Sequence, residues 1–293
     1  MKRLVVNADD FGLTENTSQG IAEAHRRGIL TSATLLANGA AFDSAVELAR
    51  GSPELGVGVH LNLTNGRPIS DHSMVPSLVN HNGHFSGSPA RLARRILARR
   101  VCLAEVEREL AAQIEKVQAS GIAATHLDGH KHVHMLPGVF PIVVRLAQRY
   151  RISGVRVAIE RTVGLAGMLR SHPAAAGTIL MQYLRGRALA LLAPDCRERL
   201  RQAGIASSMY FFGITQTGLL DAVVLDTLLW NLPEGTSELV CHPGYADDAL
   251  QQTGTRLVEQ RERELQALTR PETQKLVAAL GIQLVNYRGL IQD

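Results

Sequence analysis

Acidic and histidine residues stand at the ends of short apolar runs in four separate parts of the chain. Asp9 and Asp10 follow one such run near the N-terminus, His60 and His242 each end another, and His130 follows a fourth. Carboxylate oxygens and imidazole nitrogens are common ligands of divalent metal ions. Two adjacent carboxylates repel each other unless a cation or a donor compensates. The pattern therefore predicts a metal centre that could activate water for hydrolysis.

Four histidines lie close together in the middle of the chain. His126, His130, His132 and His134 fall within nine residues, and Asp128 lies among them. They cannot all bind one ion, and each imidazole that does needs its other nitrogen fixed by a carboxylate or carbonyl. The remaining members are expected around the ligands. A structural zinc site is disfavoured, because such sites normally use cysteines and close at four protein ligands.

Other interpretations of these residues are weaker. Asp9 and Asp10 could simply cap the helix that follows them. A Cys241–His242 nucleophilic pair is disfavoured, because successive side chains of a strand point to opposite faces. The chain contains no GxSxG elbow or Walker loop, and no GxGxxG in its strand–helix context. The other histidines are expected to be solvated: His25, His72, His81, His84 and His172.

Strand-like and helical runs alternate along the chain, which is typical of βαβ units and a parallel sheet. The expected strands are Arg3–Ala8, Leu30–Ala37, Gly56–Leu63, Ala124–Leu127, Val155–Ile159, Ser207–Phe212, Glu238–Cys241 and Gln283–Asn286. The expected helices are Asn16–Arg27, Ala41–Ala49, Ala90–Ala119, Pro137–Gln148, Leu220–Leu229 and a block over Thr255–Ala279. We predict an irregular, TIM-like (β/α) barrel of the α/β class. The candidate residues would then meet at the carboxyl ends of its strands, where barrel active sites lie.

Composition narrows the class of protein. The chain has 293 residues, 45% hydrophobic and 20% charged, which is normal for a globular protein and fits one domain over residues 1–293. Aromatic residues make up only 4%, and no nucleic-acid-binding pattern is present, so we expect no nucleic-acid partner.

No apolar run approaches the roughly 18–20 residues that span a bilayer. Three dispersed cysteines and no signal sequence favour a cytoplasmic protein.

The segment at about residues 161–202 looks like a helical insertion between two strands. From Thr162 to Pro194 it has no acidic residue, while arginines punctuate apolar stretches. Basic amphipathic helices are typical of surfaces that meet anionic lipid headgroups, here at the cytoplasmic face of a membrane. The alternatives are packing on the barrel or an interface in a homo-oligomer, and the sequence leaves both open.

Five segments, taken together, resemble the YdjC-like (ChbG-type) carbohydrate deacetylases. They are NADDFG (7–12), GILTSATLLANG (28–39), GVGVHLNLT (56–64), THLDGHKHVHM (125–135) and CHPG (241–244). The resemblance implies an irregular barrel that removes an acetyl group from an amino sugar. It also implies one divalent ion held by Asp10, His60 and His130 with positions left open for water. These donors suit zinc, and with bound waters also magnesium, manganese or cobalt.

Further roles follow from the same resemblance. It implies that Asp9 is a general base and that His242 is an acid or polarising group. The other candidates, either near the ligands or in contact with substrate, are His126, Asp128, His132, His134, Asn62, Arg156 and Tyr245.

A finer likeness is to the hopanoid-biosynthesis (HpnK) branch, carried by YFFGITQTG (210–218), HPGYADDAL (242–250) and the apolar insertion. It implies a glycolipid substrate, N-acetylglucosaminyl bacteriohopanetetrol. One alternative is a deacetylase of soluble N-acetylated oligosaccharides such as chitobiose derivatives. Another is a metal-binding interaction protein without catalysis, which the paired carboxylates Asp9 and Asp10 argue against.

Overall fold

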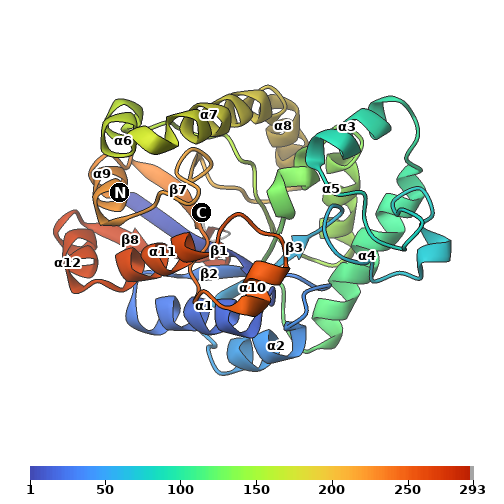
Figure 1. Cartoon of the computed structure of the whole chain (residues 1–293), viewed down its shortest axis with the longest axis horizontal. Helices are drawn as coiled ribbons and strands as arrows, with labels where there is room; N and C mark the ends of the chain where they lie inside the picture. The colour runs from blue at the N-terminus through green and yellow to red at the C-terminus, as the bar shows by residue number, and fades with distance from the viewer. Residues whose placement is uncertain (291–293) are drawn as a thin grey trace.

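Eight parallel strands form the centre of the computed structural model, which describes residues 1–290 (Figure 1). They are β1 (Lys2–Phe11), β2 (Ser32–Leu35), β3 (Gly56–Leu61), β4 (His126–Gly129), β5 (Gly154–Val155), β6 (Tyr210–Phe212), β7 (Gly235–Cys241) and β8 (Ile282–Leu284). Seven of them run in the order β5-β4-β3-β2-β1-β7-β6, and β8 pairs with the first residues of β1.

The curled sheet is a TIM-like barrel that is closed only loosely, as predicted. Its two outer strands, β5 and β6, are short. Isolated parallel bridges join the segments around them, between Gly154 and Ala206 and between Glu160 and Phe211. Of the strands expected at Val155–Ile159 and Ser207–Phe212, residues 156–159 and 207–209 are irregular backbone.

Helices surround the sheet (Figure 1). They are α1 (Glu15–Arg27), α2 (Phe42–Arg50), α3 (Pro89–Leu97), α4 (Leu103–Ala119), α5 (Phe140–Arg149), α6 (Leu165–Ser171), α7 (Ala176–Ala190), α8 (Ala193–Ala203), α9 (Ala222–Trp230), α10 (Asp248–Gln252), α11 (Glu259–Thr269) and α12 (Pro271–Ala279).

Two of the long helices expected from sequence are each divided. The stretch Ala90–Ala119 forms α3 and α4, and between them Arg99 has a φ of 54°, outside the helical region. The block Thr255–Ala279 forms α11 and α12, which separate at Arg270 before Pro271. The residue before a proline avoids the helical conformation, and proline is well placed in the first helical turn.

The segment interpreted as an insertion contains α6, α7 and α8, which lie together along one side of the molecule in Figure 1. Only a narrow strip of α7 is buried, at Ile179, Gln182 and Gly186. The Gln182 side chain donates to the carbonyl oxygen of Thr217 at 2.9 Å. The insertion is thereby fixed to the loop that follows β6.

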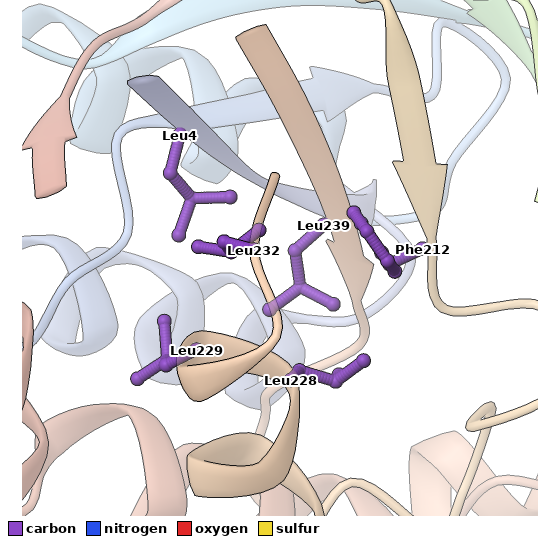
Figure 2. Close-up of a pocket in the computed structure, with 6 residues that line it drawn as sticks. All are labelled: Leu4, Phe212, Leu228, Leu229, Leu232 and Leu239. Atoms are coloured by element: carbon purple, nitrogen blue, oxygen red, sulfur yellow. The ribbon is translucent and has the colours of Figure 1, made fainter. Parts of the chain in front are cut away.

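Leucines fill the layer between α9 and the sheet. Figure 2 shows the lining of this layer, and no space for a water molecule remains between the side chains. The lining consists of five leucines and one phenylalanine: Leu4, Leu228, Leu229, Leu232, Leu239 and Phe212. This region is core, and the polar candidates lie elsewhere. Among the described residues, no helix is long and apolar enough to cross a membrane.

Candidate metal centre

Asp9 and Asp10 reach the same site because the backbone of β1 is irregular between them. In a regular strand their side chains would point to opposite faces of the sheet. Asp10 instead has a φ of 67°, and the pairing of β1 with β2 shifts register between Ala8 and Phe11. Such a backbone conformation is uncommon for a residue other than glycine and is often found at functional sites. It turns the Asp10 carboxylate back toward that of Asp9.

Asp10, His60 and His130 lie together at this site. The Nδ1 atom of His130 lies 3.1 Å from Asp10 Oδ1, and His60 Nε2 lies 3.7 Å from the same oxygen. One potential ligand atom from each residue falls within a 4.8 Å cluster. Ligand atoms at about 2.1 Å from a tetrahedral zinc ion lie roughly 3.4 Å apart, so the spacing fits a divalent ion.

The Nδ1 atom of His60, on the side of the ring away from Asp10, contacts a carboxylate and a hydroxyl group. It lies 2.7 Å from Asp128 Oδ1 and 3.1 Å from the Thr34 hydroxyl. His60 and Asp128 are register partners on β3 and β4, which places them side by side inside the barrel. This carboxylate–imidazole pair is the arrangement that orients histidine ligands in metal sites.

Arg156 joins three carboxylates beneath the site. Its two terminal nitrogens donate to Asp9 at 2.9 and 3.0 Å, Nη1 also lies 2.6 Å from Asp128, and Nε donates to Glu238 at 2.8 Å. All four side chains are buried. The bidentate contact fixes the orientation of the Asp9 carboxylate.

A second buried arginine holds Asp10. Arg261, on α11, donates from Nη2 to Asp10 Oδ2 at 2.6 Å. Burial acts to raise the pKa of Asp10, but the charge of Arg261 and the contacts with His130 lower it well below its usual value. The Asp10 carboxylate is therefore ionised at neutral pH and can bind a cation.

The acidic groups of the centre outnumber its arginines, which favours a cation, although burial raises the pKa of Glu238. Four carboxylates, of Asp9, Asp10, Asp128 and Glu238, surround two guanidinium groups. Burial acts to lower the pKa of His60, but the charges of Asp128 and Asp9 outweigh it and raise that pKa to about 9. The imidazole of His60 lies in the field of several anions, a surrounding that favours a positive charge at this position.

His242 lies near the same carboxylates at the end of β7. The residue is half-buried, and its Nδ1 atom is buried without a hydrogen-bond partner among residues 1–290. Burial lowers the pKa of His242 to about 4, against the opposing charges of Asp9 and Asp10. The ring is therefore neutral at neutral pH and carries one N–H. The adjacent thiol of Cys241 is also buried, which raises its pKa well above 9 and makes it a poor nucleophile.

The other three histidines of the cluster support the barrel around this centre. His126 stacks on Tyr287 with ring centroids 3.8 Å apart. His134 Nε2 lies 3.0 Å from the carbonyl oxygen of Arg156. His132 packs edge-on against Phe211. Burial lowers the pKa of all three, to about 3 for His126 and about 4 for His134, so they are neutral.

Two candidates make their hydrogen bonds away from the metal cluster. The Asn62 amide bonds to Asn38, Thr64 and Asn65 and so stabilises the turn after β3. The Tyr245 hydroxyl bonds to Glu23 of α1. Of the five histidines expected to be solvated, two are not: His25 Nδ1 lies 2.8 Å from the Leu30 carbonyl oxygen, and His172 Nε2 lies 3.2 Å from Asp221. His25 lies in the last turn of α1, and His172 directly follows α6.

Several residues of the centre were not recognised from sequence. Thr34 and Glu238 lie inside expected strands, where a polar residue in an apolar run is a usable signal. Arg261 and Glu264 lie in the highly charged segment QRERELQAL, which reads as an exposed helix. Both are nevertheless buried, and Glu264 accepts hydrogen bonds from the backbone N–H of His242 at 2.6 Å and of Gly218 at 3.2 Å.

The fold and centre define a parallel α/β-barrel protein with a buried aspartate–histidine cluster able to hold a metal ion. Residues 3–279 match the family model described as YdjC-like protein, and the chain belongs to this family.

Named relatives span almost the whole chain. It is 39% identical to a carbohydrate deacetylase of Geobacillus stearothermophilus, an alignment that covers 97% of this chain and 96% of the relative. It is 33% identical to a chitooligosaccharide deacetylase of Klebsiella pneumoniae, over 97% and 98% of the two chains. A solved structure, a putative cellobiose-phosphate cleavage protein from Enterococcus faecalis V583, superposes with a TM-score of 0.79. It is 31% identical and covers 99% of this chain and 98% of its own.

Proposed function

We propose that this protein is a metal-dependent carbohydrate N-deacetylase. The observation that carries the proposal is the meeting of Asp10, His60 and His130 in one buried cluster, with Asp9 and His242 beside it. The named relatives are carbohydrate and chitooligosaccharide deacetylases, which supports hydrolysis of an N-acetyl group on an amino sugar. An interaction protein that only stores a metal would have no use for the second carboxylate.

Asp10, His60 and His130 would hold the ion. A bound divalent ion lowers the pKa of water and polarises a carbonyl group, which is the chemistry that an unactivated amide requires. Asp9 would accept the proton of the attacking water, with Arg156 fixing its orientation. An aspartate and two histidines with open positions suit zinc, and with bound waters also magnesium, manganese or cobalt.

His242 would act on the acetyl group from the other side of the site. Because its ring is neutral at neutral pH, it can donate its one N–H to the acetyl oxygen as charge develops there. It can also accept a proton during the reaction and pass it to the departing amine. This role needs an imidazole nitrogen without a competing partner, as Nδ1 of His242 is among residues 1–290.

Two substitutions separate binding from catalysis. Asp9→Asn should lose most of the turnover but keep the metal, whereas His130→Ala should lose both. Metal content of the purified variants and acetate release from N-acetylglucosaminides measure these two quantities. A metal-free Asp9→Asn protein would refute the assignment of Asp9 as the base.

We also propose that the amino sugar is carried on a lipid, with N-acetylglucosaminyl bacteriohopanetetrol as the specific candidate. The α7 helix exposes an apolar stripe at Leu180, Met181 and Leu184, whose side chains are more than half exposed. Arg185 and Arg187 flank it, and no acidic residue occurs from 162 to 194. Such a face suits the anionic surface of a membrane in which a glycolipid resides.

The second candidate is a soluble chitooligosaccharide, which the names of the relatives favour. Co-sedimentation with vesicles of anionic and of neutral lipids, together with turnover on both substrates, distinguishes the two. The lipid proposal expects binding to anionic vesicles that Leu184→Ser weakens, and faster deacetylation of the glycolipid. Absence of vesicle binding with full activity on chitobiose derivatives would contradict it.

A further inference from the structure

Arg261 occupies an unusual position for an arginine on an outer helix. Its side chain is fully buried, although α11 is one of the most highly charged segments of the chain. Burial of an unpaired charge is strongly unfavourable, so an arginine in such a place normally has a specific electrostatic partner. That partner is Asp10, through Nη2 and Oδ2 at 2.6 Å.

The two oxygens of Asp10 face in different directions. Oδ1 faces the imidazoles of His130 and His60, while Oδ2 is held by Arg261. An oxygen that already accepts a short charge-assisted hydrogen bond is a poorer metal ligand. The contact therefore leaves Oδ1 as the oxygen free for an ion.

The other terminal nitrogen of Arg261 is unused. Its Nη1 atom is buried and has no hydrogen-bond partner within residues 1–290, while Nε donates to the Leu257 carbonyl oxygen at 3.1 Å. A guanidinium is planar, so Nη1 lies beside the nitrogen that binds Asp10. An unpaired buried N–H is costly and is usually satisfied by a group absent from the bare protein.

The same helix also holds the loop that carries His242. The backbone N–H of Gly244 donates to the carbonyl oxygen of Arg261 at 3.3 Å, and Glu264, one turn further on, accepts from the N–H of His242. The first turns of α11 thus contact both sides of the centre, Asp10 and the His242 loop.

We propose that Arg261 is a positioning residue that makes Asp10 a one-oxygen metal ligand, and that its free Nη1 donates to an oxygen of the acetyl group or of the acetate product. This inference rests on the proposed function, because it assumes a metal at Asp10 and an acetylated substrate. It adds a guanidinium to the residues that face the reacting group.

Two substitutions test the proposal, with Arg263→Gln as the matched control on an exposed face of α11. Arg261→Gln removes the charge. Arg261→Lys keeps the charge but has a single terminal nitrogen, so nothing takes the place of Nη1. Zinc affinity is measured by competition with a chromogenic chelator, folding by thermal unfolding, and kcat and KM on an N-acetylated chitobiose.

We expect Arg261→Gln to weaken zinc binding about 10- to 100-fold, the usual effect of losing a group that orients a ligand. Arg261→Lys should retain more of the zinc affinity but lose kcat at saturating zinc by roughly tenfold or more, because a charged hydrogen bond to the reacting group is gone. Arg263→Gln should match the wild type in both.

Some results would overturn the proposal. If a folded Arg261→Gln protein binds zinc within twofold of the wild type, Arg261 does not position Asp10. If Arg261→Lys keeps full kcat, Nη1 does not serve the substrate. Should Arg261→Gln fail to fold, the uncharged Arg261→Met takes its place in the zinc measurement, and unchanged affinity in that variant would exclude the positioning role, while kcat of Arg261→Lys still decides the role of Nη1. A wild type that binds no metal would instead refute the proposed function.

Discussion

The φ of 67° at Asp10 brings together two neighbouring carboxylates that strand geometry would otherwise separate. The pair Asp9–Asp10 could be selected from sequence because of its residue types and its place after an apolar run. The bulge that lets both side chains face one site could not, since a register shift depends on the neighbouring strand. The sequence thus indicates which residues are candidates, whereas the backbone conformation determines where their side chains point.

His60 gives a prediction on pH. Burial opposes the charged form, but Asp128 and Asp9 raise the pKa of His60 in the metal-free protein to about 9, above the usual 6.5. A metal ion must displace that proton, so affinity is reduced at any pH below about 9. We expect the logarithm of the metal association constant to rise by about one for each pH unit between roughly pH 6.5 and 9, and then to level off.

Calorimetry in buffers of different ionisation enthalpy measures this, since metal binding at pH 7.5 should release about one proton. The same group affects folding. Because its folded pKa is raised, His60 stabilises the metal-free protein fully below pH 6.5, and this contribution is lost as the pH rises through 9. An association constant that does not change over this range would contradict the assigned charge of His60.

At the scale of elements, α1 supports the His242 loop through close backbone contact. A Cβ atom on Gly20 would lie 2.5 Å from the Cα of Gly244, closer than side-chain carbons approach backbone. Tyr245, next to Gly244, also donates from its backbone N–H to the Asn16 carbonyl oxygen at 3.3 Å. The end of β7 is therefore placed by a helix that follows β1, more than 200 residues earlier in the chain.

Gly20→Ala should push this loop outward, lowering stability by about 1–3 kcal/mol and reducing kcat through displacement of His242. Gly177→Ala is the matched control, because Gly177 also lies in a helix and has open space at its Cβ. That control should be neutral or gain about 0.5–1 kcal/mol, since alanine favours helix. Denaturant unfolding and steady-state kinetics test both, and a Gly20→Ala enzyme with wild-type kcat would show that the contact does not position the site.

Helices and strands were predicted well where hydrophobic periodicity is regular, as at α1, β3 and β7. The short strands β5 and β6 were overestimated: Val157 and Ala158, which follow β5, are buried without forming a regular ladder, and Met209, which precedes β6, is exposed. The charged face of α11 predicts solvent exposure, yet it buries Arg261 and Glu264 against the centre. Tertiary contacts override local pattern in both cases.

Over the whole molecule, the centre brings together residues from Asp9 to Arg261. β8 pairs with the first residues of β1, and the turn after β8 lies at the opposite end of the strands from the centre. Tyr287 stacks on His126 and donates to Glu238 at 2.6 Å, and Gly58 and Gly154 leave room for these two rings. The C-terminal segment thus contacts the network of Arg156 from below. We propose that residues 1–293 form one cooperative unit.

Cooperativity should appear when the metal is removed. A chelator-treated protein should unfold in a single transition at lower temperature than the metal-bound form, and a free metal concentration of 100 times Kd should add about 2.7 kcal/mol to the free energy of unfolding. Calorimetry with and without zinc measures both. Two separate transitions, with only one affected by metal, would show that the chain folds as more than one unit.

The sequence by itself determined the class of fold and the chemistry of the centre, because strand–helix alternation and residue types at strand ends are local properties that survive without coordinates. Residue types at strand ends made Asp9, Asp10, His60, His130 and His242 candidates for one centre, and the family resemblance implied Asp10, His60 and His130 as its ligands. Only the tertiary structure decided which groups hold those residues: Thr34 and Asp128 behind His60, Glu238 below Arg156, and Arg261 behind Asp10. Such partners come from distant segments, and what selects them is the cost of burying charge, which depends on where the whole chain places each side chain.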